Sequence, residues 1–171
     1  MPAATPLLSL GPTRDGAVNM TDIDTRSAAT EAAITALTAF YEGLSPFSLD
    51  GIGALYAPDA QFKDPFNAVV GVTAIRRIFE HMFATVEAPR FVVTHRIVQG
   101  EQAMLGWDFH LRLRGRAIVV RGVSHLRVDA DGRVCVHRDY WDPAEELYAH
   151  LPVLGGLMRL LRRKLSAAGQ G

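Results

Sequence analysis

Cysteine is almost absent from this sequence of 171 residues, because Cys135 is the only one. A single cysteine excludes a disulfide framework and any metal site built from several cysteines, and it fits a reducing compartment, so we expect a cytoplasmic protein. Net charge is absent as well: 18 basic residues balance 18 acidic ones, and no overall field attracts nucleic acid. Long hydrophobic runs are also missing, since Leu7–Leu10 is too short for a signal peptide or a membrane span.

What is present is an ordinary globular composition, with 49% hydrophobic and 21% charged residues. A chain of this size buries about 70% of its unfolded surface, so we expect it to fold without a metal or a cofactor. Residues 1–22 are rich in proline and glycine and predict a disordered tail, with Met20 as an alternative start of the chain. We expect one domain over residues 23–142 and a helical extension over residues 143–171.

The spacing of apolar residues predicts helices in the first half of the chain and strands in the second. Three helices and one short strand are expected first, namely the helices Thr25–Leu44, Leu49–Ala57 and Val72–Val86 and the strand Ala60–Asp64. Four strands joined by tight turns follow, at Arg90–Gln99, Met104–Arg114, Ala117–Asp129 and Arg133–Trp141. Helices followed by an antiparallel meander predict an α+β fold.

Alternation along the strands predicts which side chains face the helices. In the second strand of the meander the apolar side chains are Trp107, Phe109, Leu111 and Leu113, and Asp108, His110 and Arg112 point the other way. The third strand has its more apolar face at Ile118, Val120, Leu126 and Val128. In the last strand Cys135, His137, Asp139 and Trp141 share one face, and the pattern does not decide whether that face is the inner one.

Several short segments then occur in a suggestive order: Phe40-Tyr41, Leu55–Ala60, Asp64-Pro65-Phe66, Gly71 before a helix, Asp131–Val134 and Tyr140-Trp141. In this order and spacing they resemble the nuclear transport factor 2-like superfamily, in its SnoaL-like and ketosteroid-isomerase-like branch, over about residues 28–142. The resemblance implies a cone, in which a strongly curved antiparallel sheet wraps around three helices and encloses an apolar pocket. It also implies a homodimer formed through the outer face of the sheet.

The ligand expected for such a pocket is a small apolar molecule with a carbonyl or similar acceptor. His95 and His137 could reach the pocket, although each is also typical of a hydrogen-bonded structural histidine. The predicted ligand-binding residues are Tyr41, Tyr56, Phe66, Phe79, Phe83, His95, Trp107, Phe109, His137 and Trp141.

Asp64 is the first candidate for chemistry. In the isomerase branch, the aspartate of Asp-Pro-Phe is the general base that moves a proton between carbons next to a carbonyl. A carboxylate beside an apolar cavity suits that task, because desolvation raises its pKa. The alternative is that Asp64 caps the turn around Pro65 and Asn67, which is common for aspartate before proline.

The remaining isomerase residues are not matched. An alignment without gaps places Phe40 and Phe79 where the resemblance expects tyrosines, and Arg121 where it expects a protonated aspartate; a shift of one residue would put Tyr41 in place of Phe40. Steroid isomerisation by the known residues is therefore not expected. Arg121 has three open interpretations: an ion pair with Asp64 or Asp139, a binder of an anionic or enolate-like oxygen, or a side chain on the outer face.

Asp139 is the third candidate catalytic residue, with Asp64 and Arg121. The segment His137–Asp142 resembles one in limonene-epoxide-hydrolase-like members of the superfamily, whose aspartate acts with an Arg-x-Asp pair. Here the candidate for the aspartate of that pair is Asp108, and the residue two positions before it is Gly106 instead of arginine. Epoxide hydrolysis is therefore a distant alternative. No histidines have a spacing that predicts a metal site.

Two functions stay open at this stage: a proton-transfer isomerase or aldol-type cyclase with Asp64 as base, and a non-catalytic ligand-binding or dimerisation domain. The segment Leu154–Leu165 is amphipathic and basic. We expect it to pack over the domain, with contact to a membrane surface as the less favoured alternative.

Overall fold

The computed structural model describes residues 20–113 and 115–147. Its helical segments are α1 (Met20–Glu42), the 3-10 helix η1 (Ser48–Gly51), α2 (Ile52–Leu55), α3 (Val72–Thr85) and α4 (Pro143–Glu146). Its strands are β1 (Tyr56–Lys63), β2 (Ala68–Val70), β3 (Glu87–Gln99), β4 (Gln102–Leu113), β5 (Arg116–Val128) and β6 (Val134–Tyr140). The α+β class expected from the sequence is confirmed.

All six strands belong to one sheet, in the order β2-β1-β6-β5-β4-β3. Strands β3 to β6 form the antiparallel meander that the turn signals predict. The pattern did not reveal β2, which pairs antiparallel with β1, or the parallel pairing of β1 with β6. This parallel pair brings the first strand beside the last one, and the candidate site depends on it.

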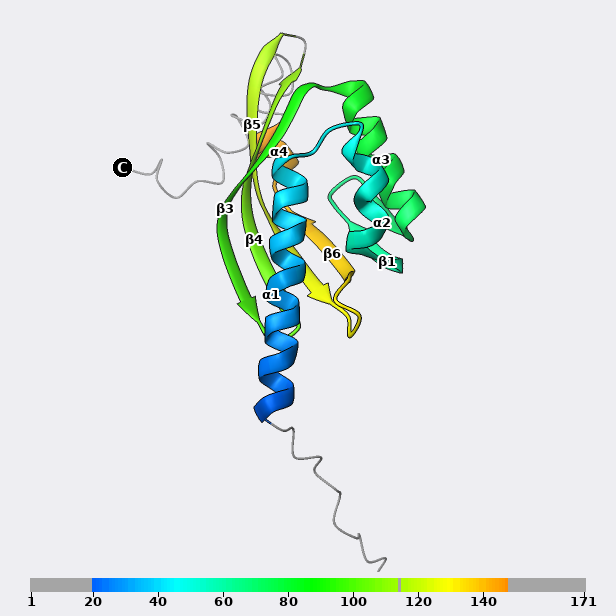
Figure 1. The fold of residues 1–171 in the computed structure, drawn as a ribbon. Coiled ribbons are helices and arrows are strands. Elements are labelled where there is room, and N and C mark those ends of the chain that lie inside the picture. Colours follow the sequence, from blue (N-terminus) through cyan, green and yellow to red (C-terminus); the bar gives the residue numbers. More distant parts are fainter. Residues whose placement is uncertain (1–19, 114, 148–171) are drawn as a thin grey trace, which may run out of the picture.

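Helices α1, α2 and α3 cover one side of a curved sheet (Figure 1). Helix α1 lies along β3 and β4, and α2 and α3 lie beside β1. Gly71 connects β2 to α3 with a φ of 93°, a conformation that favours glycine, and its N–H donates to the Ala60 carbonyl at 2.8 Å. That bond fixes the start of α3 against β1.

Several predicted boundaries need correction. Helix α1 begins at Met20, so residues 20–22 are helical and do not belong to a disordered tail. Strand β1 begins at Tyr56, so Pro58 lies inside a strand. The short helix expected after residue 142 is α4, where Asp142 accepts a hydrogen bond from the Ala144 N–H at 2.8 Å. The predicted helix Leu154–Leu165 lies outside the described residues.

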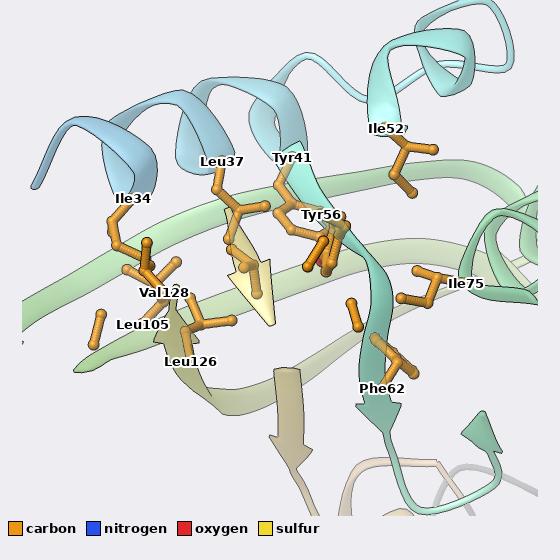
Figure 2. Close-up of a cluster of buried hydrophobic side chains, with 14 of the residues drawn as sticks. Ile34, Leu37, Tyr41, Ile52, Tyr56, Phe62, Ile75, Leu105, Leu126 and Val128 are labelled. Atoms are coloured by element: carbon orange, nitrogen blue, oxygen red, sulfur yellow. The ribbon is translucent and has the colours of Figure 1, made fainter. Parts of the chain in front are cut away.

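The main core lies between the helices and the sheet (Figure 2). Ile34 and Leu37 of α1, Ile75 of α3 and Leu126 of β5 are completely buried. Burial of a side chain of this size favours folding by about 1.5–3 kcal/mol. A second cluster of buried residues consists of Trp107, Leu111, Ile118 and Val120. The burial of these four confirms the inner faces that alternation predicts for β4 and β5.

Candidate functional site

A narrow cavity lies where the two clusters meet, between α1, α3 and the strands β3 to β6. Its free volume, counted as the space that the centres of water molecules can occupy, is about 30 Å³. That is room for about two water molecules. Apolar side chains form most of its wall, and the full lining is Leu37, Tyr41, Phe79, Phe91, Val93, Leu105, Trp107, Ser124, His137 and Asp139.

The polar part of the wall begins with a row of three hydrogen bonds. Tyr41 Oη lies 2.6 Å from Tyr56 Oη, and Tyr56 Oη lies 2.6 Å from His137 Nδ1. On the other side of the imidazole, His137 Nε2 lies 2.8 Å from Asp139 Oδ1. Tyr41 is in the last turn of α1, Tyr56 opens β1, and His137 and Asp139 share one face of β6. Figure 2 shows the two tyrosines side by side.

A second row of bonds reaches the same carboxylate oxygen. Trp107 Nε1 donates to Ser124 Oγ at 2.9 Å, and Ser124 Oγ donates to Asp139 Oδ1 at 2.5 Å. Ser124 stands directly opposite Asp139 in the pairing of β5 with β6, which explains the short distance. Asp139 Oδ1 therefore receives hydrogen bonds from both His137 and Ser124.

The hydrogen-bonded groups are withdrawn from solvent. His137 is 3% exposed and Tyr56 is completely buried, whereas the side chain of Asp139 keeps 16% of its surface exposed. Burial raises the pKa of Tyr41 and of Tyr56 well above the ordinary value of 10.0. Both tyrosines are therefore neutral phenols near pH 7 and act as hydrogen-bond donors rather than as bases.

Five of the residues selected from the sequence line this cavity: Tyr41, Phe79, Trp107, His137 and Asp139. Tyr56 stands behind the wall, joined to it by its hydroxyl. Tyr41 lines the cavity, and its neighbour Phe40 does not.

Five other residues selected as ligand-binding lie outside this cavity. Phe83 is half-buried against the main core, and Phe109 is half-buried and stacked on Phe91, with 4.3 Å between ring centroids. Phe66 is 56% exposed and touches the ring of Trp141. His95 is exposed on β3. Their predicted roles therefore have no support from the cavity geometry.

Asp64 has the turn-capping role that the sequence left open as an alternative. Its Oδ1 accepts from the backbone N–H groups of Phe66 at 2.7 Å and Asn67 at 2.6 Å, and the Asn67 amide donates to Oδ2 at 2.9 Å. Asp64 is not part of the cavity wall. A catalytic role for Asp64 remains an untested prediction, and the carboxylate at the cavity is that of Asp139.

Arg121 lies on the outer face of the sheet. Its side chain is 67% exposed, and its Nη1 lies 3.8 Å from Glu146 Oε2 of α4. Of the three interpretations of Arg121, the side chain on the outer face is the one that the structure shows, and alternation along β5 gave that side. Asp108 stands opposite Arg121 in the β4–β5 pairing and is likewise absent from the cavity wall, which contains no arginine.

Ser124 is the polar residue of the cavity wall that the sequence pattern did not reveal. Its side chain points to the same face of β5 as Leu126 and Val128, which is the apolar face. A small polar residue on an inner face was therefore the signal in the sequence that could have revealed it.

Among the described residues, no three His, Cys, Asp or Glu side chains are grouped to hold a metal ion. In the same part of the chain, no helix is both long and apolar enough to cross a membrane.

Comparison with known proteins places this geometry in a family. One similar structure is a protein from Catenulispora acidiphila with a ketosteroid isomerase-like fold, solved in complex with trimethylamine. It matches with a TM-score of 0.58 and 20% sequence identity, and the match covers 67% of this chain and 88% of that protein. A limonene-epoxide-hydrolase-like enzyme of M. tuberculosis matches with a TM-score of 0.60 and 18% sequence identity. The match covers 79% of this chain and 96% of that enzyme.

TsrD from Streptomyces laurentii matches with a TM-score of 0.59 and 21% identity, over 73% of this chain and 96% of its own. At these identities the structures show a shared fold. No curated protein matches the chain in sequence. The model of the SnoaL-like domain matches residues 37–137, which is more than half of the chain. This match shows that the chain belongs to the family of SnoaL-like domains, and the shared fold agrees with it.

Proposed function

We propose that the chain binds a small, mainly apolar carbonyl compound in its cavity and moves a proton on it, as an isomerase or aldol-type cyclase does, with Asp139 as the general base. The observation that carries the proposal is the position of Asp139. Its carboxylate belongs to an otherwise largely apolar wall, and its Oδ1 is held by His137 and Ser124.

Removing a proton from carbon next to a carbonyl needs a base that is fixed in place and poorly solvated. Two hydrogen bonds to Oδ1 fix the carboxylate, and Oδ2 is the oxygen available to a guest. The rings of Phe79, Phe91 and Trp107 exclude water from the same space. The hydroxyl of Tyr41 belongs to the same wall and is hydrogen-bonded to Tyr56 behind it.

The size of the cavity limits the guest. A free volume of about 30 Å³ suits a molecule the size of acetone, and a larger substrate requires movement of the surrounding aromatic side chains. The structurally similar protein from Catenulispora acidiphila was solved with trimethylamine, which is also a small molecule.

The narrowness of the cavity also favours the alternative function, a small-molecule-binding domain without catalysis. Epoxide hydrolysis finds less support, because the catalytic set of that enzyme includes an arginine and the described cavity wall has none. A catalytic measurement on a small ketone distinguishes proton transfer from binding without catalysis.

The test is hydrogen–deuterium exchange of acetone in D₂O, followed by the loss of its methyl signal in proton NMR. The unmodified chain should accelerate exchange over buffer alone. Asp139→Asn keeps the size of the side chain and removes the base, so the exchange rate should fall by about 100-fold or more. A parallel titration follows the indole N–H of Trp107, whose resonance moves if acetone enters the cavity.

Two further aspartates make the measurement specific. Asp131→Asn makes the same change at an exposed residue of the β5–β6 turn and should leave exchange unaltered. Asp64→Asn tests the base that the family resemblance implies. Full activity in Asp139→Asn would remove Asp139 as the base, and a loss confined to Asp64→Asn would return that role to Asp64. Binding of acetone without exchange would favour the non-catalytic domain.

A further inference from the structure

His137 is a buried titratable group that the proposed chemistry uses only as a hydrogen-bond donor. Its charge state matters, because a neutral imidazole and an imidazolium affect the neighbouring carboxylate differently. Four polar side chains from four elements face it: Tyr41 from α1, Tyr56 from β1, Ser124 from β5 and Asp139 from β6. The remaining ring contact is Phe62, whose centroid lies 4.9 Å away.

The directions of the hydrogen bonds follow from the groups at the ends of the two rows. The indole of Trp107 can only donate, so Ser124 accepts from it and gives its own hydrogen to Asp139. Oδ1 of Asp139 is then an acceptor, and the 2.8 Å contact places a hydrogen on His137 Nε2. The remaining question is whether Nδ1 also carries a hydrogen, which would make the ring cationic.

Tyr56 decides this question. Its hydroxyl lies 2.6 Å from Nδ1, and Tyr41 lies 2.6 Å from the same hydroxyl. Among the described residues, the hydroxyl of Tyr41 has no other acceptor at an ordinary hydrogen-bond distance, so we assign its hydrogen to Tyr56. The single hydrogen of Tyr56 is then directed at Nδ1, which is a bare acceptor. Tyr41 cannot replace Tyr56, because its Oη lies 3.5 Å from Nδ1, beyond an ordinary hydrogen-bond distance.

We infer that Tyr56 is a positioning residue that locks His137 in its neutral tautomer, with the hydrogen on Nε2, so that Asp139 receives a neutral hydrogen bond instead of an ion pair. This inference rests on the proposed function and deepens it. An imidazolium beside Asp139 would stabilise the charged carboxylate and weaken it as a base. Without Tyr56, protonation of His137 becomes possible and should reduce the rate of proton abstraction.

The first test needs no substrate, and its one variant serves only to assign a signal. Nitrogen-15 NMR of the imidazole rings in the full chain reports which ring nitrogens carry hydrogen, and His137→Gln identifies the signal of His137. Between about pH 5.5 and pH 8, around the range where histidines ordinarily titrate, His137 should keep a hydrogen on Nε2 and a bare Nδ1. A doubly protonated ring at neutral pH, or a hydrogen on Nδ1 alone, would overturn the lock.

The second test is the pH profile of acetone exchange in Tyr56→Phe. Since Tyr56 does not line the cavity, KM should be unchanged. The value of kcat should fall by about tenfold as the pH is lowered from about 8 to 5.5, with an inflection that the unmodified chain lacks. Tyr140→Phe removes a hydroxyl from a half-exposed tyrosine and should show no inflection.

His137→Gln supplies the decisive comparison. A glutamine amide can donate to Asp139 and accept from Tyr56, but it does not titrate. Tyr56→Phe in the His137→Gln background should therefore show no inflection over the same range of pH. An inflection that persists there, or a Tyr56→Phe profile identical to that of the unmodified chain, would overturn the lock while Asp139 remains the base. Absence of exchange in the unmodified chain would count against the proposed function alone, because the NMR measurement judges the lock independently.

Discussion

At the scale of single residues, Gly122 determines where Trp107 can lie. The two residues stand opposite each other on β5 and β4, and the indole covers the glycine. A Cβ added at Gly122 would lie 2.3 Å from Cη2 of Trp107, which is far below a van der Waals contact. The missing side chain of Gly122 therefore creates the space from which Trp107 reaches Ser124.

We predict that Gly122→Ala forces the indole away from β5 and breaks its bond to Ser124. Overpacking of this kind lowers the free energy of unfolding by about 1–3 kcal/mol. Urea unfolding followed by circular dichroism measures the change. Gly53→Ala is the control, because a Cβ there meets no atom within 4 Å and the residue lies in α2, so stability should be equal or slightly higher. Equal stability of Gly122→Ala and the unmodified chain would show that the indole moves without loss.

At the scale of single elements, two threonines of α1 differ in their hydrogen bonding. The hydroxyl of Thr35 donates to the Glu31 carbonyl at 2.7 Å and accepts from Arg96 of β3 at 2.8 Å, so it joins the helix to the sheet. The hydroxyl of Thr38, one turn further along, is buried and finds no hydrogen-bond partner among the described residues. A threonine hydroxyl therefore stabilises the fold at position 35, where it is hydrogen-bonded, and destabilises it at position 38, where it is buried without a partner.

We expect opposite effects from the same substitution at these two positions. Thr38→Val keeps the shape and removes an unsatisfied hydroxyl, so it should raise the free energy of unfolding by about 1 kcal/mol. Thr35→Val removes two hydrogen bonds and should lower it by a similar amount. Thermal unfolding of both variants checks the prediction, and a lower stability of Thr38→Val would show that its hydroxyl has a partner.

At the scale of the whole molecule, the outer face of the sheet carries exposed apolar side chains. Ile97 of β3 and Met104 of β4 are 66% and 39% exposed and stand opposite each other, with His125 and Arg138 continuing the same row across β5 and β6. Exposed apolar groups on a broad sheet suit contact with a second copy of the chain. We therefore keep the homodimer through this face as a proposal.

The oligomeric state tests that proposal directly. Light scattering after size-exclusion chromatography should give twice the mass of one chain, and Met104→Lys should reduce it to a single chain, because a buried unpaired ammonium opposes association. Val70→Lys makes a similar change at a 67% exposed residue of the edge strand β2 and should leave the dimer intact. A single-chain mass for the unmodified protein would refute the dimer.

Local pattern was enough to identify most elements and several site residues. The four strands of the meander, the inner side of Trp107 and the outer side of Arg121 follow from alternation, which depends only on the geometry of an extended chain. The order of short motifs identified the SnoaL-like family, which the match over residues 37–137 shows. For Arg121, alternation on β5 gave the correct side of the sheet and alignment to a distant family did not. Alternation depends only on neighbouring residues of one strand, whereas an alignment depends on spacing over the whole chain.

The sequence by itself determined the class of fold and the inward-facing apolar residues, since these depend on composition and on periods of a few residues, and the order of its short motifs resembled the family. Only the tertiary structure decided that Asp64 serves a turn and that Asp139 meets the cavity. The parallel pairing of β1 with β6 joins Tyr56 to His137 across 81 positions of sequence, and the pairing of β5 with β6 sets Ser124 against Asp139. Contacts over such separations are set by the packing of the whole sheet, and no local period contains them.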